Sequence, residues 1–159
     1  IGSGLVGSEM CIRDRYYYNE NFLNERRYNM VSAGQTATAT VTVTESNIAK
    51  TMKSGSLDVF ATPAMCALME EAAQAAVQPY LEEGEGTVGI ALSITHEAPT
   101  PLGATVTAKA IVSAVEGRKI TFDIEASDGI GIIGRGTHER FVINNEKFMA
   151  KVHSRANAN

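Results

Sequence analysis

The distribution of hydrophobic and polar positions predicts one strand followed by one long helix in the first half of the chain. Residues 36–44 alternate strictly between threonine and alanine or valine, as in a strand with one buried face. Residues 58–81 are rich in alanine, methionine, leucine, glutamate and glutamine, which favour helix. The Thr62-Pro63 pair marks the helix start, with Thr62 predicted as the N-cap, and Pro79 marks the end.

After Gly86 the alternation resumes over four stretches that we predict to be strands, the last pattern reaching about Phe148. They cover residues 87–96, 104–115, 119–127 and 132–144. The dipeptides Glu116-Gly117 and Asp128-Gly129 mark hairpin turns, which join antiparallel strands. One helix cannot cover both faces of a sheet. We therefore predict an α+β hotdog fold, with a curved antiparallel sheet of about five strands wrapped around one long central helix.

The same pattern predicts three segments. Residues 1–33 have no sustained periodicity and are expected to be a disordered or extraneous leader, since residues 7–15 resemble translated sequencing-adapter text. Residues 34–152 form the folded domain, and residues 153–159 form a polar, frayed tail. An open sheet leaves a free edge that proteins commonly cover by pairing, so we expect a homodimer.

Composition and charge exclude several classes of protein. The net charge is -4, and the chain lacks the clustered basic surface of a nucleic-acid binder. The two cysteines, Cys11 and Cys66, fit neither a disulfide framework nor metal-ligand spacing, which indicates a reducing, cytoplasmic location and no metal. No stretch contains the roughly 18 consecutive apolar residues of a membrane span.

Four side chains are candidates for chemistry. Thr62 either caps the helix or presents its hydroxyl to a ligand at the positive end of the helix dipole. Glu70 lies eight residues later, roughly 80° around the helix axis and so on the same side. Cys66 shares that side, but buried helical cysteines are usually inert packing. His96 ends a predicted strand just before a proline-containing loop. Each of these residues also has a purely structural explanation.

Thr62, Glu70 and His96 belong to a set of short motifs that resembles the fluoroacetyl-CoA thioesterase family of hotdog proteins. The matching strings, spread over residues 36–152, are Val59-Phe-Ala-Thr62, Leu68-Met-Glu70, Thr95-His96, Thr100-Pro101, Gly103, Val115-Glu-Gly-Arg118, Gly136-Thr-His-Glu-Arg140 and residues 146–151. The resemblance implies that Thr62, Glu70 and His96 are catalytic. It also implies that Gly89 and Arg140 lie on the substrate side.

The implied reaction is hydrolysis of an acyl-CoA to a carboxylic acid and free CoA, without a cofactor. Either Thr62 attacks after losing its proton to Glu70 or His96, or Glu70 attacks and Thr62 only orients the substrate. Arg140 could pair with a carboxylate or with a CoA phosphate. The alternative function is a hotdog module that binds acyl-CoA without hydrolysing it, and a dehydratase-type hotdog enzyme would need a further signature that is missing.

One segment departs from the family pattern. Members selective for the fluorinated substrate carry aromatic residues before the Val-Phe-Ala-Thr string, whereas residues 50–57 here contain none. A loop of glycine, serine and lysine cannot form the same apolar lid. We therefore expect a short or medium acyl-CoA as the substrate.

Overall fold

A computed structural model of the chain describes residues 30–157, and residues 31–157 belong to one compact unit. Its elements, in chain order, are β1 (Thr36–Thr42), α2 (Thr62–Val77), the 3-10 helix η1 (Gln78–Tyr80), β2 (Glu85–His96), β3 (Thr105–Glu116), β4 (Lys119–Ser127), β5 (Ile132–Asn144) and α3 (Asn145–Ala156). Most of the predicted leader, residues 1–29, lies outside the described residues.

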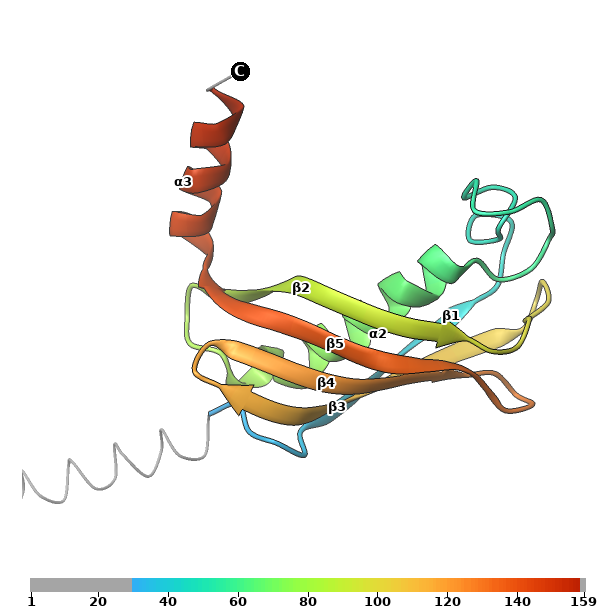
Figure 1. Cartoon of the computed structure of the whole chain (residues 1–159), viewed down its shortest axis with the longest axis horizontal. Helices are drawn as coiled ribbons and strands as arrows, with labels where there is room; N and C mark the ends of the chain where they lie inside the picture. The colour runs from blue at the N-terminus through green and yellow to red at the C-terminus, as the bar shows by residue number, and fades with distance from the viewer. Residues whose placement is uncertain (1–29, 158–159) are drawn as a thin grey trace, which may run out of the picture. The chain divides into compact units, whose positions relative to one another are not determined.

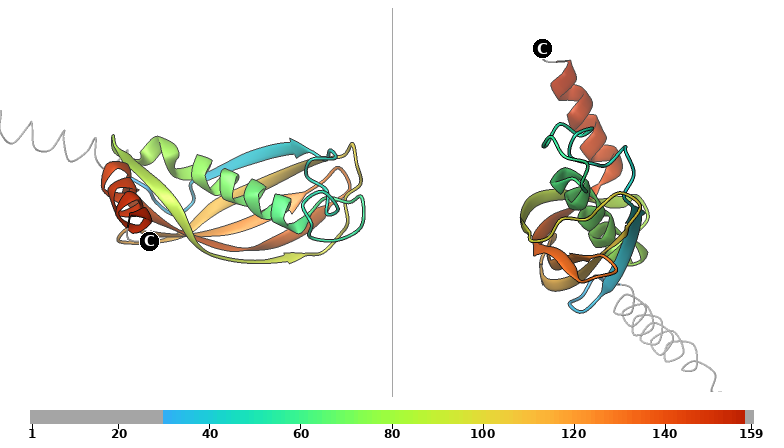
Figure 2. Two further views of the ribbon diagram at one scale, coloured as in Figure 1. Left: turned by 90° about the horizontal axis from the view of Figure 1, so that it is seen from above. Right: turned by 90° about the vertical axis from the view of Figure 1, so that its right-hand side faces the viewer.

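The five strands form one sheet in the order β1-β3-β4-β5-β2, and every neighbouring pair is antiparallel. The short turn at Gly117, which has a positive φ of 63°, joins β3 to β4. Figure 2 shows the sheet curving around α2, which lies along its inner face. The predicted α+β hotdog architecture is confirmed.

The core lies between α2 and the inner face of the sheet. In β3 and β4 every second residue is buried, as expected for strands with one face toward a core. Ala72, Ala73 and Ala76 of α2 are buried and small, so the helix backbone approaches the sheet closely. Larger side chains such as Met65 and Phe122 fill the remaining space. Packing of this kind fixes α2, and therefore its functional residues, against the strands.

Both ends of α2 differ slightly from the prediction. The N-cap is Ala61, which makes no side-chain hydrogen bond, and Thr62 is the first helical residue. The prediction that Thr62 is the N-cap is therefore wrong by one position, because its backbone already turns into the helix. At the other end the α-helix stops at Val77, and the chain continues as a 3-10 turn through Tyr80.

The C-terminal segment is helical where we predicted strand and frayed tail. The Asn144 side chain accepts a hydrogen bond from the backbone N–H of Lys147 and so caps α3. Glu146 in the first turn, and His153 and Arg155 in the last, complement the helix dipole. Local capping therefore ends β5 and overrides the apparent strand pattern. The helix α3 projects from the sheet and buries none of its residues (Figure 1).

The domain also begins slightly earlier than predicted. Val31 packs against the core, and the backbone N–H of Gly34 donates to the carbonyl of Val112 at 2.8 Å. Residues 31–33 thus belong to the folded unit. Within residues 30–157, no helix has both the length and the apolar character to cross a membrane.

Candidate active site

A hydroxyl and an imidazole meet where α2 begins and β2 ends. Thr62 Oγ1 lies 2.8 Å from His96 Nδ1. Because Ala61 caps the helix without a side-chain bond, the Thr62 hydroxyl is not a helix cap. The explanation of Thr62 as a helix cap is therefore wrong. A hydroxyl bonded to a histidine nitrogen is the arrangement that activates a weak nucleophile.

The second ring nitrogen of this histidine is also well placed for chemistry. His96 Nε2 is buried and has no hydrogen-bond partner among the described residues. In a neutral imidazole one nitrogen donates and the other accepts. If Nδ1 accepts from the Thr62 hydroxyl, Nε2 carries the proton. Since buried polar atoms are normally hydrogen-bonded, this N–H is suited to an oxygen of a bound substrate.

The carboxylate of Glu70 lies beside a glycine of β2. The Glu70 side chain is 45% exposed, and its Oε1 lies 3.5 Å from His138 Nε2. A Cβ atom added to Gly89 would lie 2.5 Å from Glu70 Oε1 and 3.0 Å from His138 Cε1. Gly89, which the family resemblance placed on the substrate side, therefore leaves the space that the carboxylate occupies.

Arg140 lies inside the protein, with only 6% of its surface exposed. Its Nε donates to Thr87 Oγ1 at 2.8 Å, its Nη2 to the Thr87 carbonyl at 2.9 Å, and its Nη1 to His138 Nε2 at 3.1 Å. Burial lowers the pKa of Arg140, and the nearby charge of Glu70 opposes that effect. All three guanidinium nitrogens thus bond to protein partners, Thr87 and His138.

The predicted catalytic residues thus form two groups along one line of contact, the α2–β2 seam, defined by the pairs Thr62–His96 and Glu70–Gly89. Along the helix axis, eight residues at about 1.5 Å each separate Thr62 from Glu70 by about 12 Å. The structure brings Thr62 and His96 into direct contact. It places Glu70 beside Gly89 and His138 instead.

His138 is the residue of this second group that sequence reasoning missed, because it lies within a strand. One signal was available. In a strand, residues two positions apart point to the same face, so His138 and Arg140 share the inner face of β5 with its buried positions. A histidine and an arginine together on a buried face need polar partners.

Cys66 is unsuited to nucleophilic attack. Burial raises the pKa of its thiol, and the negative charge of Glu70 raises it further. The thiol therefore stays protonated near neutral pH, and a protonated thiol is a poor nucleophile. Cys66 is a free cysteine, and within residues 30–157 no cluster of three or more histidine, cysteine, aspartate or glutamate residues is arranged to hold a metal ion.

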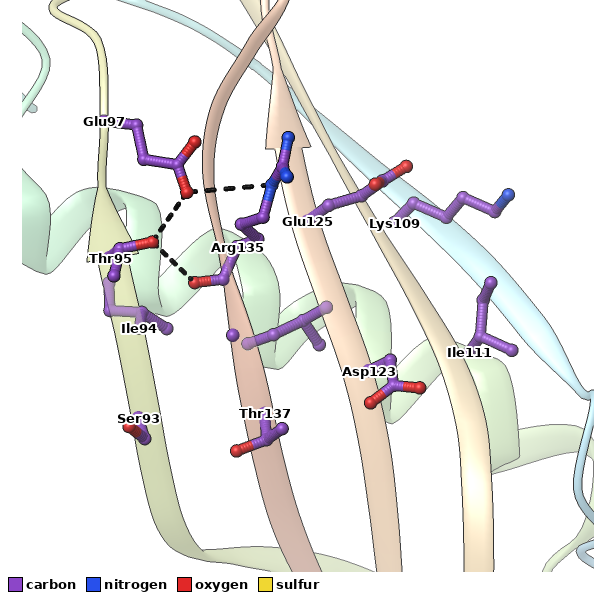
Figure 3. Close-up of a pocket in the computed structure, with 12 residues that line it drawn as sticks. Ser93, Ile94, Thr95, Glu97, Lys109, Ile111, Asp123, Glu125, Arg135 and Thr137 are labelled. Carbon is purple, nitrogen blue, oxygen red and sulfur yellow. Dashed lines mark hydrogen bonds and ion pairs between the residues drawn. The ribbon is translucent and has the colours of Figure 1, made fainter.

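A hollow of about 590 Å³ lies on the outer face of the sheet, over β2 to β5 (Figure 3). There Glu97 pairs with Arg135 at 3.6 Å and accepts a hydrogen bond from Thr95 Oγ1 at 2.8 Å. Successive strand residues point to opposite faces. Thr95 therefore faces this hollow while His96 faces α2, and the hollow is separate from the seam.

The fold and the seam together define the class of protein. A hotdog domain that aligns a hydroxyl, an imidazole and a carboxylate between its helix and an edge strand has the groups needed for acyl transfer to water.

Comparisons with known proteins give the family. The fluoroacetyl-CoA-specific thioesterase family matches residues 43–146. The fluoroacetyl-CoA thioesterase of Streptantibioticus cattleyicolor is 52% identical over 101 residues, which are 64% of this chain and 73% of that protein. The chain belongs to the fluoroacetyl-CoA-specific thioesterase family and is an acyl-CoA thioesterase.

Solved structures agree. The structure of the fluoroacetyl-CoA thioesterase FlK is 42% identical with a TM-score of 0.74, covering 78% of this chain and 96% of that one. A variant of the same thioesterase in complex with acetyl-CoA is 41% identical with a TM-score of 0.74, covering 79% and 98%. A thioesterase superfamily member from Thermus thermophilus is 28% identical with a TM-score of 0.74, covering 81% and 98%.

Proposed function

We propose that this thioesterase hydrolyses short or medium acyl-CoA substrates, with Thr62 as the nucleophile and His96 as its general base. The observation that carries this assignment is the 2.8 Å contact between Thr62 Oγ1 and His96 Nδ1. The pair also lies at the N-terminal end of α2. The partial positive charge of that end favours the oxyanion that forms during attack.

The reaction has two halves. Thr62 Oγ attacks the thioester carbonyl carbon while its proton passes to His96 Nδ1. The C–S bond then breaks, and the CoA thiolate takes the proton from His96. This leaves the acyl group as an ester on Thr62. In the second half, water attacks that ester, restores the Thr62 hydroxyl and releases the carboxylic acid. No cofactor enters either half.

We assign Glu70 to the second half as the base that activates water. Its carboxylate is half-exposed and therefore within reach of water. It lies two helical turns from Thr62 on the same seam, about 12 Å along the axis. Helical side chains lean toward the N-terminus, which brings the carboxylate back toward the Thr62 end, where the activated water must lie between the carboxylate and the ester. A positioned carboxylate acting as a general base contributes about 10²–10⁴-fold to a rate. The other route open from the sequence makes Glu70 the nucleophile. In that route the Glu70 carboxylate itself must reach the thioester carbonyl, and Thr62 forms no bond to the acyl group.

A trapping experiment distinguishes the two routes. Purified wild type, Thr62→Ala and Glu70→Gln are mixed with acetyl-CoA or hexanoyl-CoA, quenched in acid and mapped by peptide mass spectrometry. We expect Glu70→Gln to release one equivalent of CoA quickly and to accumulate an acyl group on Thr62. An acyl group on Glu70 in the wild type would overturn the assignment. Wild-type thiol release no faster than that of the Thr62→Ala/Glu70→Gln double variant would mean a non-catalytic binding module.

The segment that precedes α2 bears on which acyl groups the enzyme accepts. Residues 50–57 are all exposed and include no aromatic side chain, so they provide no apolar lid for a fluoroacetyl group. We expect kcat/KM to be comparable for acetyl-, butyryl- and hexanoyl-CoA and not to favour fluoroacetyl-CoA. A preference for fluoroacetyl-CoA of a hundredfold or more over acetyl-CoA would contradict this substrate class.

The proposal includes a cytoplasmic homodimer paired through β2. This strand is 12 residues long and pairs with β5 on one side only, whereas the opposite edge strand β1 has 7 residues. A long free edge invites pairing with a second copy. Light scattering after gel filtration should give twice the chain mass of 17.0 kDa, and a monomer at micromolar concentration would contradict the dimer.

A further inference from the structure

His138 is a buried polar residue for which the proposed reaction assigns no role. Only 1% of its surface is exposed. The ring of Phe122 lies against it, with ring centroids 6.1 Å apart. Its two nitrogens reach three functional neighbours, namely the carbonyl of Ala91, the guanidinium of Arg140 and the carboxylate of Glu70. A buried imidazole in such surroundings must adopt one definite protonation state.

Two independent contacts select the same tautomer. His138 Nδ1 lies 2.8 Å from the Ala91 carbonyl oxygen, which can only accept, so Nδ1 carries a proton. His138 Nε2 lies 3.1 Å from Arg140 Nη1, which can only donate, so Nε2 carries a lone pair. The imidazole is therefore neutral. Burial lowers the pKa of His138, in agreement with this assignment.

The neutral tautomer determines what Glu70 experiences. Glu70 Oε1 lies 3.5 Å from His138 Nε2, and two lone pairs facing each other make no hydrogen bond. The carboxylate is thus not occupied by an ion pair with the imidazole. The Arg140 guanidinium, fixed by Thr87 and His138, supplies positive charge that interacts electrostatically with Glu70. The facing charged groups are Glu70 from α2 and Arg140 from β5.

A bulge in β2 provides the backbone carbonyl that binds His138. The pairing of β2 with β5 is interrupted between Gly89 and Ala91, so that the intervening Ile90 bulges outward with 52% of its surface exposed. A bulge disrupts the regular ladder and redirects nearby groups. Here the Ala91 carbonyl accepts the His138 side chain. The same short segment also provides Gly89, whose missing side chain leaves room for Glu70.

We propose that His138 is a positioning residue of the thioesterase, which as the neutral Nδ1–H tautomer anchors Arg140 beside Glu70 while leaving the Glu70 carboxylate free to act on water. This inference rests on the proposed role of Glu70. In this scheme His138 exchanges no proton with the substrate, and its Nε2 makes no hydrogen bond to Glu70 Oε1, 3.5 Å away. Its effect on turnover passes through Glu70 and Arg140.

A double-mutant cycle tests whether His138 acts through Glu70. Steady-state thiol release is measured for wild type, His138→Gln, Glu70→Gln and the combined variant. We expect His138→Gln to lower kcat by about tenfold to a hundredfold, as a misplaced catalytic group does, with KM changed less than twofold. In the Glu70→Gln background the same change should lower kcat less than twofold further, because residues acting through one another are not additive.

The matched control is His153→Gln, the same chemical change on the exposed helix α3, which should leave kcat and KM unaltered. Thermal melts accompany every variant, and His138→Asn replaces His138→Gln if the latter does not fold. Nitrogen-15 NMR of wild-type imidazoles gives an answer that needs no variant. It should show His138 at pH 7 as a neutral ring with its proton on Nδ1.

The outcomes separate this inference from the proposed function. A Glu70→Gln variant with wild-type turnover would overturn the role of Glu70 and this inference with it. If Glu70→Gln is slow, and His138→Gln lowers kcat in that background by the same factor as in the wild type, the inference alone is overturned. An NMR signal from a charged ring or from a proton on Nε2 would also overturn it. Non-additive losses together with the Nδ1–H tautomer would support it.

Discussion

The two groups on the α2–β2 seam are built in different ways. Thr62 and His96 lie at the ends of their elements and bond directly to each other, and no salt bridge within residues 30–157 reaches either of them. Glu70 lies in mid-helix and is surrounded by mid-strand residues that are buried and bonded among themselves. Ends of elements expose reactive groups to a ligand, whereas mid-element positions gain support from the core. The comparison predicts that the first group depends on few residues and the second on many.

Removing the imidazole of the first group should have the largest effect. Loss of a general base costs about 10²–10⁴-fold in rate, so His96→Ala should lower kcat by that factor. Stability should change little, because His96 lies at the end of its strand. Thiol release and a thermal melt check both points. A loss of less than tenfold would show that Thr62 does not need this base.

Adding one methyl group beside Glu70 should disturb only the second group. In Gly89→Ala the new Cβ would approach Glu70 Oε1 to 2.5 Å, so the carboxylate must move, and a displacement near 1 Å can cost about 10²-fold in rate. The control is Gly129→Ala, where a Cβ meets nothing within 4 Å. We expect Gly89→Ala to lower kcat up to a hundredfold and Gly129→Ala to leave it unchanged. Equal activities of the two variants would contradict the tight fit.

The buried histidine of the second group should make stability depend on pH. Its pKa is lowered in the folded protein, mainly by burial, so the unfolded chain binds a proton more readily below its ordinary pKa of about 6.5. Unfolding free energy should therefore fall as the pH drops below about 6.5, by at most about 1.4 kcal/mol per pH unit for one proton. Urea titrations of wild type and His138→Gln at several pH values isolate the contribution of His138 to the pH dependence of the unfolding free energy. If the unfolding free energies of the two proteins change equally with pH between pH 7 and pH 5, the neutral imidazole is contradicted.

The smallest effect is expected at Cys66, which lies on α2 between the two groups. Because burial and Glu70 raise the pKa of its thiol, Cys66→Ser should change kcat by less than twofold. Alkylation of the wild-type thiol by iodoacetamide should be slow at pH 7 and accelerate as the pH rises. Rapid alkylation at pH 7 accompanied by loss of activity would contradict the conclusion that Cys66 takes no part in catalysis.

Much of the fold could be predicted from the sequence because its signals are local. The sequence pattern and its turn dipeptides predicted β4 and β5 with the bounds that the structure has, and the start of α2 was predicted within one residue. The helix α3 was missed because its apolar residues continue the strand pattern of β5, while the Asn144 cap that ends the strand is a single side-chain contact. Thr62 and His96 were selected as residue types at element ends. The contact between them, across 34 positions, required the fold.

The sequence by itself determined the elements of this thioesterase, its family motifs and the residue types available for catalysis, because hydrophobic periodicity and turn chemistry act over a few residues. Only the tertiary structure decided that the Thr62 hydroxyl bonds His96 instead of capping its helix, and that Glu70 lies over Gly89. It also brought His138 to the Ala91 carbonyl, 47 positions away. Contacts of this range depend on how the bulged strand, β5 and α2 pack together, and no local pattern records that packing.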